Sequence, residues 1–453
     1  MRNRWLLLPL LFLMFFRMAF ASPDIETWQT TNGARVLFVR AAELPMMDVR
    51  IGFDAGSARD AQQAGLAIMT NGMLSEGAGG LSGHMISERF EAVGAQYGNG
   101  SQRDMAWVSL RSLVDPKNLT PAVETLALLL QHPDFPAEDF ERERKRLLIA
   151  LKQKQQDPAD LAEDAFFAAV YKGHPYASPP EGTEQTVSAI KGDDLKTFYE
   201  KYYTARNAVV GIIGALTQEE AKTLAEKLVG KLPAGQKAAP LPDVPALTKP
   251  EEIKISYPSA QTHIRVGQPG MTRLDPDYFP LYVGNHALGG SGLVSHLAEE
   301  IREKRGLSYS VYSYFQPMRA EGPFLAGMET RNDQTQEALT VLHGAIKQFA
   351  EEGPSDKEFE DSVKSITGGF PLRIDSNAKI VEYLMMIGFY DLPLGYLDTF
   401  VQRVEAVTEA QVREAFKRRL NPANFVTVIV GGAAAQSAGA PAMPPTDIVG
   451  RRH

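Results

Sequence analysis

Two stretches, DDLKTFYEKYYTARNAVVGIIGA at residues 193–215 and AQVREAFKRRLNPANFVTVIVGG at residues 410–432, align with each other without gaps. Each opens with apolar residues at helical spacing, Leu195 and Tyr199 in one and Val412 and Phe416 in the other. Each closes with a β-branched run that reaches a glycine. This pattern predicts an amphipathic helix followed by a buried strand. Because the pattern occurs twice, it predicts a chain built from two homologous halves.

A second pair of segments supports the duplication and leaves a linker between the halves. EDFERERKRLLIALK at 138–152 resembles KEFEDSVKSITGGF at 357–370, whereas residues 230–254 are rich in Pro, Ala and Lys and have no periodicity. Such composition is typical of a linker. The predicted division is listed in chain order: a signal peptide at 1–21, a first domain at 22–232, a linker at 233–252, a second domain at 253–436 and a flexible tail at 437–453.

The fold class follows from the strand-like segments of the first half. Residues 34–40, 47–55 and 105–113 alternate between apolar and polar side chains, as half-buried strands do, and helical patterns lie between them. At 453 residues the chain also exceeds what one hydrophobic core usually fills. We therefore predict an α+β fold with two domains.

The N-terminus and the composition indicate export. Arg2 and Arg4 precede an apolar run that ends at Ala19-Phe20-Ala21, the arrangement of a cleaved secretory signal. The other possibility is a retained membrane anchor, but Arg17 interrupts the run before it reaches the length of a membrane-spanning helix. The chain has no cysteine, so it has neither disulfides nor thiolate metal ligands. Its net charge of −8 makes nucleic acid an improbable partner. We predict a periplasmic protein without a membrane span once the signal is removed.

The stretch GLAIMTNGMLSEG at 65–77 brings in a family resemblance. Its apolar residues form a helical stripe that suits packing on a sheet. In context it resembles the helix of the pitrilysin/insulinase family of zinc metallopeptidases that carries an inverted H-x-x-E-H motif. Residues 171–214 and 289–315 also resemble signatures of this family. The resemblance implies that each domain is a mostly antiparallel sheet with helices packed on one face, and that a linker joins the two domains in a clam-like arrangement.

The residues at the family's zinc-binding positions lack the required chemistry. The resemblance places Ile68 and Gly72 where the two His ligands belong, and Asn71 where the general base belongs. The family's third ligand lies seven residues after the Glu of a Glu-Arg pair, here Glu143-Arg144, and that position is Ala150. We therefore predict that this chain binds no zinc and that no cofactor is bound elsewhere.

A rebuilt metal site is not visible in the sequence. No two of the eight His residues lie three to five positions apart. His84 follows the motif helix by about one loop and is the remaining candidate, although a solvated loop side chain is the favoured interpretation.

Two residues of the second half match a further feature of the family. In LAEEIREKRGLSYSVYSYF, Arg302 precedes Tyr309 by the spacing of the family's Arg and Tyr pair. The resemblance implies that this pair binds the substrate backbone and stabilises an oxyanion. The alternative is structural: Arg302 would interact with the end of a helix and Tyr309 would pack in a strand.

The favoured function is a non-catalytic subunit of a heterodimeric zinc peptidase. The partner would be an H-x-x-E-H homologue that holds the zinc, and a peptide would be the substrate. Arg302 and Tyr309 would act in the partner's active site. One alternative is an inert peptide-binding or scaffold pseudo-peptidase. An enzyme with unrelated chemistry ranks last, because no Ser/His/Asp or paired-carboxylate constellation stands out.

Overall fold

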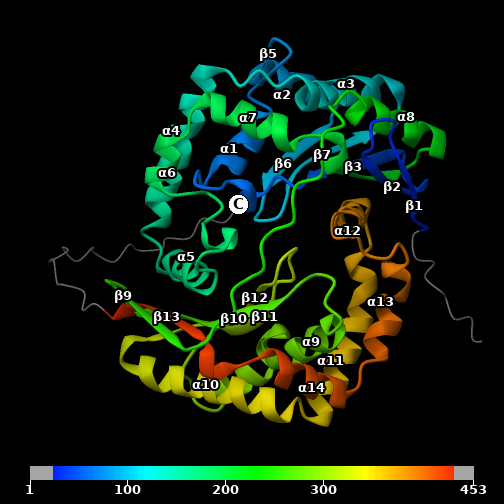
Figure 1. Ribbon diagram of the computed structural model, residues 1–453. Helices are drawn as coiled ribbons and strands as arrows, with labels where there is room; N and C mark the ends of the chain where they lie inside the picture. The colour runs from blue at the N-terminus through cyan, green and yellow to red at the C-terminus, as the bar shows by residue number, and fades with distance from the viewer. Residues whose placement is uncertain (1–23, 433–453) are drawn as a thin grey trace, which may run out of the picture.

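The computed structural model describes residues 24–432. The predicted signal peptide at 1–21 and the predicted tail at 437–453 lie outside these residues. Figure 1 shows two bodies, each with a sheet and its own set of helices, facing each other across the middle of the molecule. The blue-to-green body contains the first half of the chain and the green-to-red body contains the second half.

The first body is built on a six-stranded sheet. Its strand order is β1-β2-β8-β3-β7-β6, and every neighbouring pair is antiparallel except β2 and β8. The strands are β1 (Glu26–Gln29), β2 (Arg35–Arg40), β3 (Met46–Phe53), β6 (Gln96–Ser101), β7 (Ala106–Leu113) and β8 (Ala208–Gly214). The helices are α1 (Leu66–Met73), α2 (Gly83–Glu91), α3 (Pro116–Gln131), α4 (Ala137–Lys154), α5 (Pro158–Val170), α6 (Glu184–Ala189), α7 (Gly192–Tyr202) and α8 (Gln218–Val229). A short hairpin, β4 (Gly77–Ala78) with β5 (Leu81–Ser82), follows α1.

The second body repeats the plan with five strands. Its order is β11-β12-β10-β13-β9, and only β13 and β9 are parallel. The strands are β9 (Glu251–Tyr257), β10 (Gln261–Met271), β11 (Val311–Phe315), β12 (Gly322–Arg331) and β13 (Val426–Gly432). The helices are α9 (Tyr278–Asn285), α10 (Thr335–Glu352), α11 (Asp356–Gly369), α12 (Asn377–Phe389), α13 (Tyr396–Glu405) and α14 (Glu409–Arg419).

The predicted fold class is confirmed. The three predicted strands of the first half correspond to β2, β3 and β7, and the repeated helix-strand unit corresponds to α7 with β8 and to α14 with β13. β9 begins at Glu251, inside the segment expected to be linker. Both sheets are mostly antiparallel and carry helices, so two α+β domains of the same design are present.

Each sheet also receives one helix from the other half of the chain. Helix α12 packs against β8 and β3 of the first sheet, and α5 packs against β13 and β10 of the second. The approach is close: a Cβ added at Gly52 on β3 would lie 2.4 Å from Sδ of Met385 on α12. A Cβ added at Gly267 on β10 would lie 3.0 Å from Cζ of Phe166 on α5. The two halves therefore share their hydrophobic cores as well as a linker.

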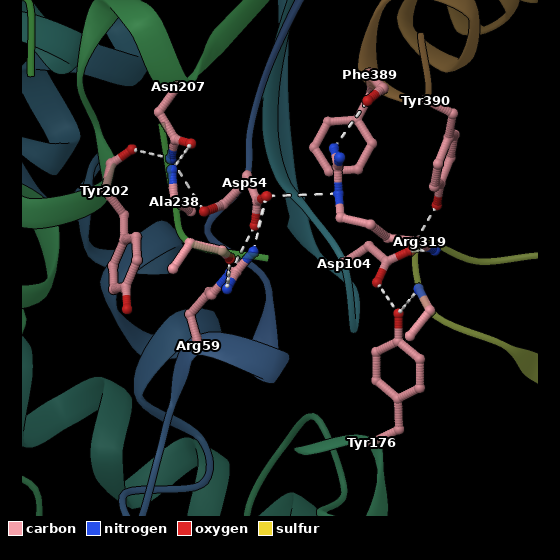
Figure 2. Close-up of polar contacts among 12 residues, drawn as sticks. Asp54, Arg59, Asp104, Tyr176, Tyr202, Asn207, Ala238, Arg319, Phe389 and Tyr390 are labelled. Atoms are coloured by element: carbon pink, nitrogen blue, oxygen red, sulfur yellow. Dashed lines mark hydrogen bonds and ion pairs between the residues drawn. The ribbon is translucent and has the colours of Figure 1, made fainter. Parts of the chain in front are cut away.

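A buried carboxylate ties the two halves together where the β6–β7 turn meets the second body. Asp104 accepts hydrogen bonds from the hydroxyl of Tyr176, from the hydroxyl of Tyr390 at 2.9 Å and from the backbone N–H of Arg319 at 2.8 Å (Figure 2). Burial raises the pKa of Asp104, while these donors favour its ionised form and oppose that rise. Tyr390 and Arg319 belong to the second half, so this carboxylate is shared across the two bodies.

A second carboxylate beside it holds the linker. Asp54 forms an ion pair with Arg59 at 2.7 Å and a longer one with Arg319 at 3.4 Å (Figure 2). Arg59 donates to the carbonyl of Ala239 at 2.7 Å, and the N–H of Ala238 donates to Oδ1 of Asn207 at 3.0 Å. Although the linker has no helix or strand before Glu251, its first part is therefore fixed against the first body.

Candidate functional site

The structure brings three of the zinc-motif positions into one cavity. Ile68 and Gly72 lie one turn apart on α1, and Ala150 lies near the end of α4, which crosses α1. All three line a cavity of about 310 Å³ between these helices. Glu143 and Arg146, which form an ion pair at 2.7 Å, also line it. The positions matched by the family resemblance are thus neighbours in space.

The cavity offers no zinc ligand at these three positions. Ile68 and Ala150 contribute hydrocarbon, and Gly72 contributes no side chain. Zinc sites in proteins are built from Cys, His, Asp and Glu donors. The residues at these positions therefore do not fit the metal that the motif would hold.

Gly72 keeps the cavity open. A Cβ built on Gly72 meets no atom within 4 Å, so neither a close contact nor an unusual backbone angle requires glycine there. Glycine within a helix is less stable than alanine by roughly 0.5–1 kcal/mol. The glycine therefore weakens α1 slightly and leaves an open apolar depression where a His side chain would stand.

Asn71, at the general-base position, serves the packing of the domain. It is buried, and its Nδ2 donates to the carbonyl of Trp107 at 3.2 Å and to the hydroxyl of Tyr203 at 3.3 Å. The side chain of Asn99 donates back to the carbonyl of Asn71 at 3.0 Å. Asn71 does not line the cavity that Ile68 and Gly72 line. Its amide therefore joins α1 to the strands of the sheet.

His84 stands apart from the motif cavity. Its side chain is 81% exposed and lies 3.3 Å from Glu88, one turn further along α2. It lines a larger cavity of about 710 Å³, which shares Arg146 with the first cavity and also contains Glu76. Glu76 pairs with Arg142, and burial together with the nearby Glu143 raises the pKa of Glu76. Within residues 24–432, no group of three or more His, Cys, Asp or Glu is arranged to hold a metal ion.

Arg302 and Tyr309 lie against each other at the surface of the second body. The guanidinium carbon of Arg302 lies 4.7 Å from the centre of the Tyr309 ring, and the Tyr309 side chain is 81% exposed. Nη1 of Arg302 is buried and donates to no acceptor in residues 24–432. β11 begins at Val311, so Tyr309 lies in the loop before the strand and not in the packed sheet. The pair presents the Tyr309 phenol to the outside, whereas the Arg302 side chain is 25% exposed and its Nε lies 3.5 Å from the carboxylate of Glu303.

The backbone around this pair is irregular. Residues Ala298–Glu303, which include Arg302, form a π-helical segment, and a second π-helical segment spans His286–Gly290. π-helical turns are rare and often occur at functional sites. Leu293 and Val294, in the short 3-10 helix Gly292–Val294 between these segments, are 64% and 82% exposed. The sequence predicted that Arg302 lies near the end of a helix, and the structure places it in the last turn of the π-helical segment Ala298–Glu303.

The shared carboxylates Asp54 and Asp104 were not predicted from the sequence. Their partners come from four separate segments of the chain, and neither carboxylate belongs to a recognisable motif. They bear on the candidate site because they fix the two bodies relative to each other.

No helix of the described residues is long and apolar enough to cross a membrane.

Comparison with protein-family models supports this architecture. Residues 35–184 match the model described as insulinase (peptidase family M16), and residues 189–366 match the model described as peptidase M16 inactive domain. The boundary between the two matches falls within the first body, before α7 and β8. The second model therefore covers the end of the first body and much of the second.

Individual relatives cover most of the chain. An uncharacterised zinc protease, YmxG, of Bacillus subtilis is 25% identical over 397 residues, which are 86% of this chain and 94% of that protein. A non-peptidase homologue, YmxG, of Helicobacter pylori is 26% identical over 411 residues, 89% of this chain and 94% of that protein.

Two solved structures are also similar. The peptidase M16 inactive domain from Pseudomonas fluorescens is 38% identical with a TM-score of 0.88, covering 91% of this chain and 99% of that chain. The periplasmic protease PqqL from Escherichia coli shares the fold at 16% identity with a TM-score of 0.75, covering 90% of this chain and 45% of that chain.

Proposed function

This chain belongs to the insulinase family of peptidases, family M16, and on that basis we propose that it is the non-catalytic subunit of a heterodimeric zinc peptidase. In this proposal an H-x-x-E-H homologue supplies the zinc and the general base, and this chain supplies Arg302 and Tyr309 to that homologue's active site. In this proposal the complex lies in the periplasm, and the predicted signal peptide supports that location.

The observation that carries the proposal is the Arg302–Tyr309 pair, with its exposed tyrosine, on a chain whose zinc-motif positions Ile68, Gly72 and Ala150 carry no metal ligand. A tyrosine ring that is 81% exposed contributes little to the core of its own domain. Its hydroxyl and the guanidinium beside it are hydrogen-bond donors, which suit a developing oxyanion and a peptide carbonyl. A partner chain that approaches this surface would meet both donors already held against each other.

The division of labour follows from where the donors lie. Ile68, Gly72 and Ala150 can neither coordinate a metal nor activate water, and Asn71 is engaged with Trp107 and Tyr203. Bond cleavage therefore has to take place on the partner. The exposed Leu293 and Val294 near the pair would provide apolar contact area for that partner.

A second candidate is a pseudo-peptidase that only binds or scaffolds. It is favoured by the names of two similar proteins, an inactive domain from Pseudomonas fluorescens and a non-peptidase homologue from Helicobacter pylori. The two candidates differ in one respect: a scaffold does not use the Tyr309 hydroxyl.

Tyr309→Phe separates them, because it removes one hydroxyl and keeps the ring that lies on Arg302. We expect the purified complex with an H-x-x-E-H homologue from the same organism to cleave a quenched fluorescent peptide. The variant should lower turnover by roughly 100-fold, the scale of losing one oxyanion donor. Tyr312→Phe, three residues further along, is the matched control and should leave turnover unchanged.

Assembly is measured on the same samples by size-exclusion chromatography. A Tyr309→Phe complex that assembles and turns over normally would contradict the subunit proposal and favour the scaffold. Chelator-sensitive cleavage by this chain alone would contradict both.

A further inference from the structure

A cavity in the second body contains two arginines and no acidic residue. Its volume is about 400 Å³, and Arg273 and Arg373 both line it, from the segment after β10 and the turn after α11. Tyr278, Tyr282 and Phe315 are among the other residues that line it. The protein as a whole is acidic, with a formal charge of −8, so this concentration of positive charge is local.

Neither arginine has a carboxylate partner among residues 24–432. Arg373 donates to the hydroxyl of Tyr282 at 2.6 Å, whereas the Arg273 side chain donates no hydrogen bond to any of the described residues. Nε of Arg273 is buried and finds no acceptor within that part of the chain. The nearest acid along the chain from Arg373 is Asp375, which is paired with Lys379 at 2.9 Å. A buried guanidinium N–H without an acceptor is costly, and an anionic ligand would satisfy it.

Aromatic rings lie beside both arginines. The guanidinium carbon of Arg273 lies 5.8 Å from the centre of the Tyr278 ring and 5.3 Å from that of Tyr390. That of Arg373 lies 5.9 Å from the centre of the Tyr282 ring. These rings restrict where each guanidinium can point, and each group keeps further N–H donors for a planar anion such as a carboxylate.

The positive charge of the cavity lining comes from Arg273 and Arg373. His286 also lines it, and burial together with the nearby Arg373 lowers the pKa of His286. A neutral imidazole adds no charge of its own, so the two guanidinium groups decide the charge preference of the cavity.

One main-chain position of β11 is available at the cavity. β11 is the edge strand of its sheet and pairs with β12 on one side. The N–H of Gln316 donates to the carbonyl of Pro323 in β12. In an antiparallel pair, successive residues point their N–H and C=O alternately toward and away from the neighbouring strand. The N–H and C=O of Phe315 therefore point away from β12. At Ser313, the next outward-facing residue, Nδ2 of Asn285 already donates to the carbonyl at 3.0 Å. The edge therefore has room for one residue of a peptide and not for a strand that continues past it.

These observations fit the end of a peptide. We propose that this cavity binds the C-terminal residue of a peptide, with its α-carboxylate on Arg273 and Arg373 and its main chain at Phe315. The rings of Tyr278 and Phe315 would take the apolar side chain of that residue. The volume is within the range of small-ligand pockets. The inference extends the proposed function, since it takes a peptide as ligand, but it concerns a different site from Arg302 and Tyr309.

Binding is measured on the chain alone, so its outcome does not depend on the partner assay. The probe is a dansylated Ala-Ala-Leu-Phe peptide with a free α-carboxylate. Its binding is measured by fluorescence anisotropy at low salt. We expect the C-terminal amide of the same peptide to bind at least about 10-fold more weakly, because it lacks the charge. An amidated peptide with an internal glutamate tests a side-chain carboxylate and should bind like the amide.

Two variants and a matched control locate the site. Arg273→Ala and Arg373→Gln should each weaken binding of the free acid by about 10-fold or more and should remove most of its preference over the amide. Arg403→Ala is the control, because Arg403 also lies over a ring of α9, Phe279 at 5.5 Å, but does not line the cavity. It should bind like the unmodified chain.

Several results would overturn the proposal. Equal affinity of the unmodified chain for the acid and the amide would overturn it, and this test needs no substituted chain. Binding by Arg273→Ala and Arg373→Gln at the unmodified level would refute the assignment to this cavity. Equal binding of the peptide with the internal glutamate would refute the terminal carboxylate.

Discussion

Two glycines within helices allow a test in which replacement by alanine should raise the stability of the protein at one position and lower it at the other. Gly72 lies on α1 at the motif cavity, and Gly284 lies on α9 in the second body. A Cβ at Gly72 meets nothing within 4 Å, whereas a Cβ at Gly284 would lie 2.3 Å from Cε2 of Phe416 and 2.6 Å from Cγ1 of Val412. Both neighbours are fully buried on α14.

The expected magnitudes follow from these distances. Gly72→Ala should raise the free energy of unfolding by roughly 0.5–1 kcal/mol, because alanine restricts the unfolded chain and suits a helix better. At Gly284 the new methyl group has to move at least about 1 Å to reach the ordinary carbon–carbon separation of about 3.5 Å. Overpacking of this kind costs about 1–3 kcal/mol, which exceeds the gain in helix propensity.

The assay is urea denaturation of both variants and of the unmodified chain, with unfolding monitored by far-UV circular dichroism. We expect the midpoint to rise for Gly72→Ala and to fall for Gly284→Ala. A fall for Gly72→Ala would mean that the cavity between α1 and α4 is filled in solution. The explanation of Gly72 as the residue that opens the cavity would then be wrong.

Two further predictions concern the motif cavity and the contact between the halves. Ile68, Gly72 and Ala150 line one cavity, so the combined variant Ile68→His, Gly72→His and Ala150→Glu should bind about one zinc per chain. The single variant Ile68→His should bind none. Elemental analysis after dialysis measures the zinc, and a triple variant without zinc would show that α1 and α4 do not bring these three positions together. Asp104→Ala should lower the free energy of unfolding by about 2–4 kcal/mol, because it leaves the hydroxyl of Tyr390 and other buried donors without an acceptor. Asp104→Asn keeps one acceptor oxygen, so it should lower the free energy of unfolding by less. Thermal unfolding ranks these variants, and an Asp104→Ala chain as stable as the unmodified one would contradict the role given to this carboxylate.

The sequence by itself determined the features that depend on local pattern or on side-chain identity. The repeated helix and strand units were readable because the spacing of apolar residues reports which face is buried. The loss of zinc ligands at Ile68, Gly72 and Ala150 was equally readable, because no fold gives a donor atom to a side chain that has none. The positions themselves came from the family resemblance, and the structure then placed them side by side.

Other features depend on contacts between distant parts of the chain, which only the tertiary structure decided. Arg273 and Arg373 lie about a hundred residues apart, and each alone has the sequence context of an ordinary surface arginine. The exchange of α5 and α12 between the two bodies has the same origin, because a helix pattern shows that a face is buried but not which sheet buries it. Asn71 turned into the core and Tyr309 remained outside the strand because competing hydrogen bonds and packing determine where a side chain points.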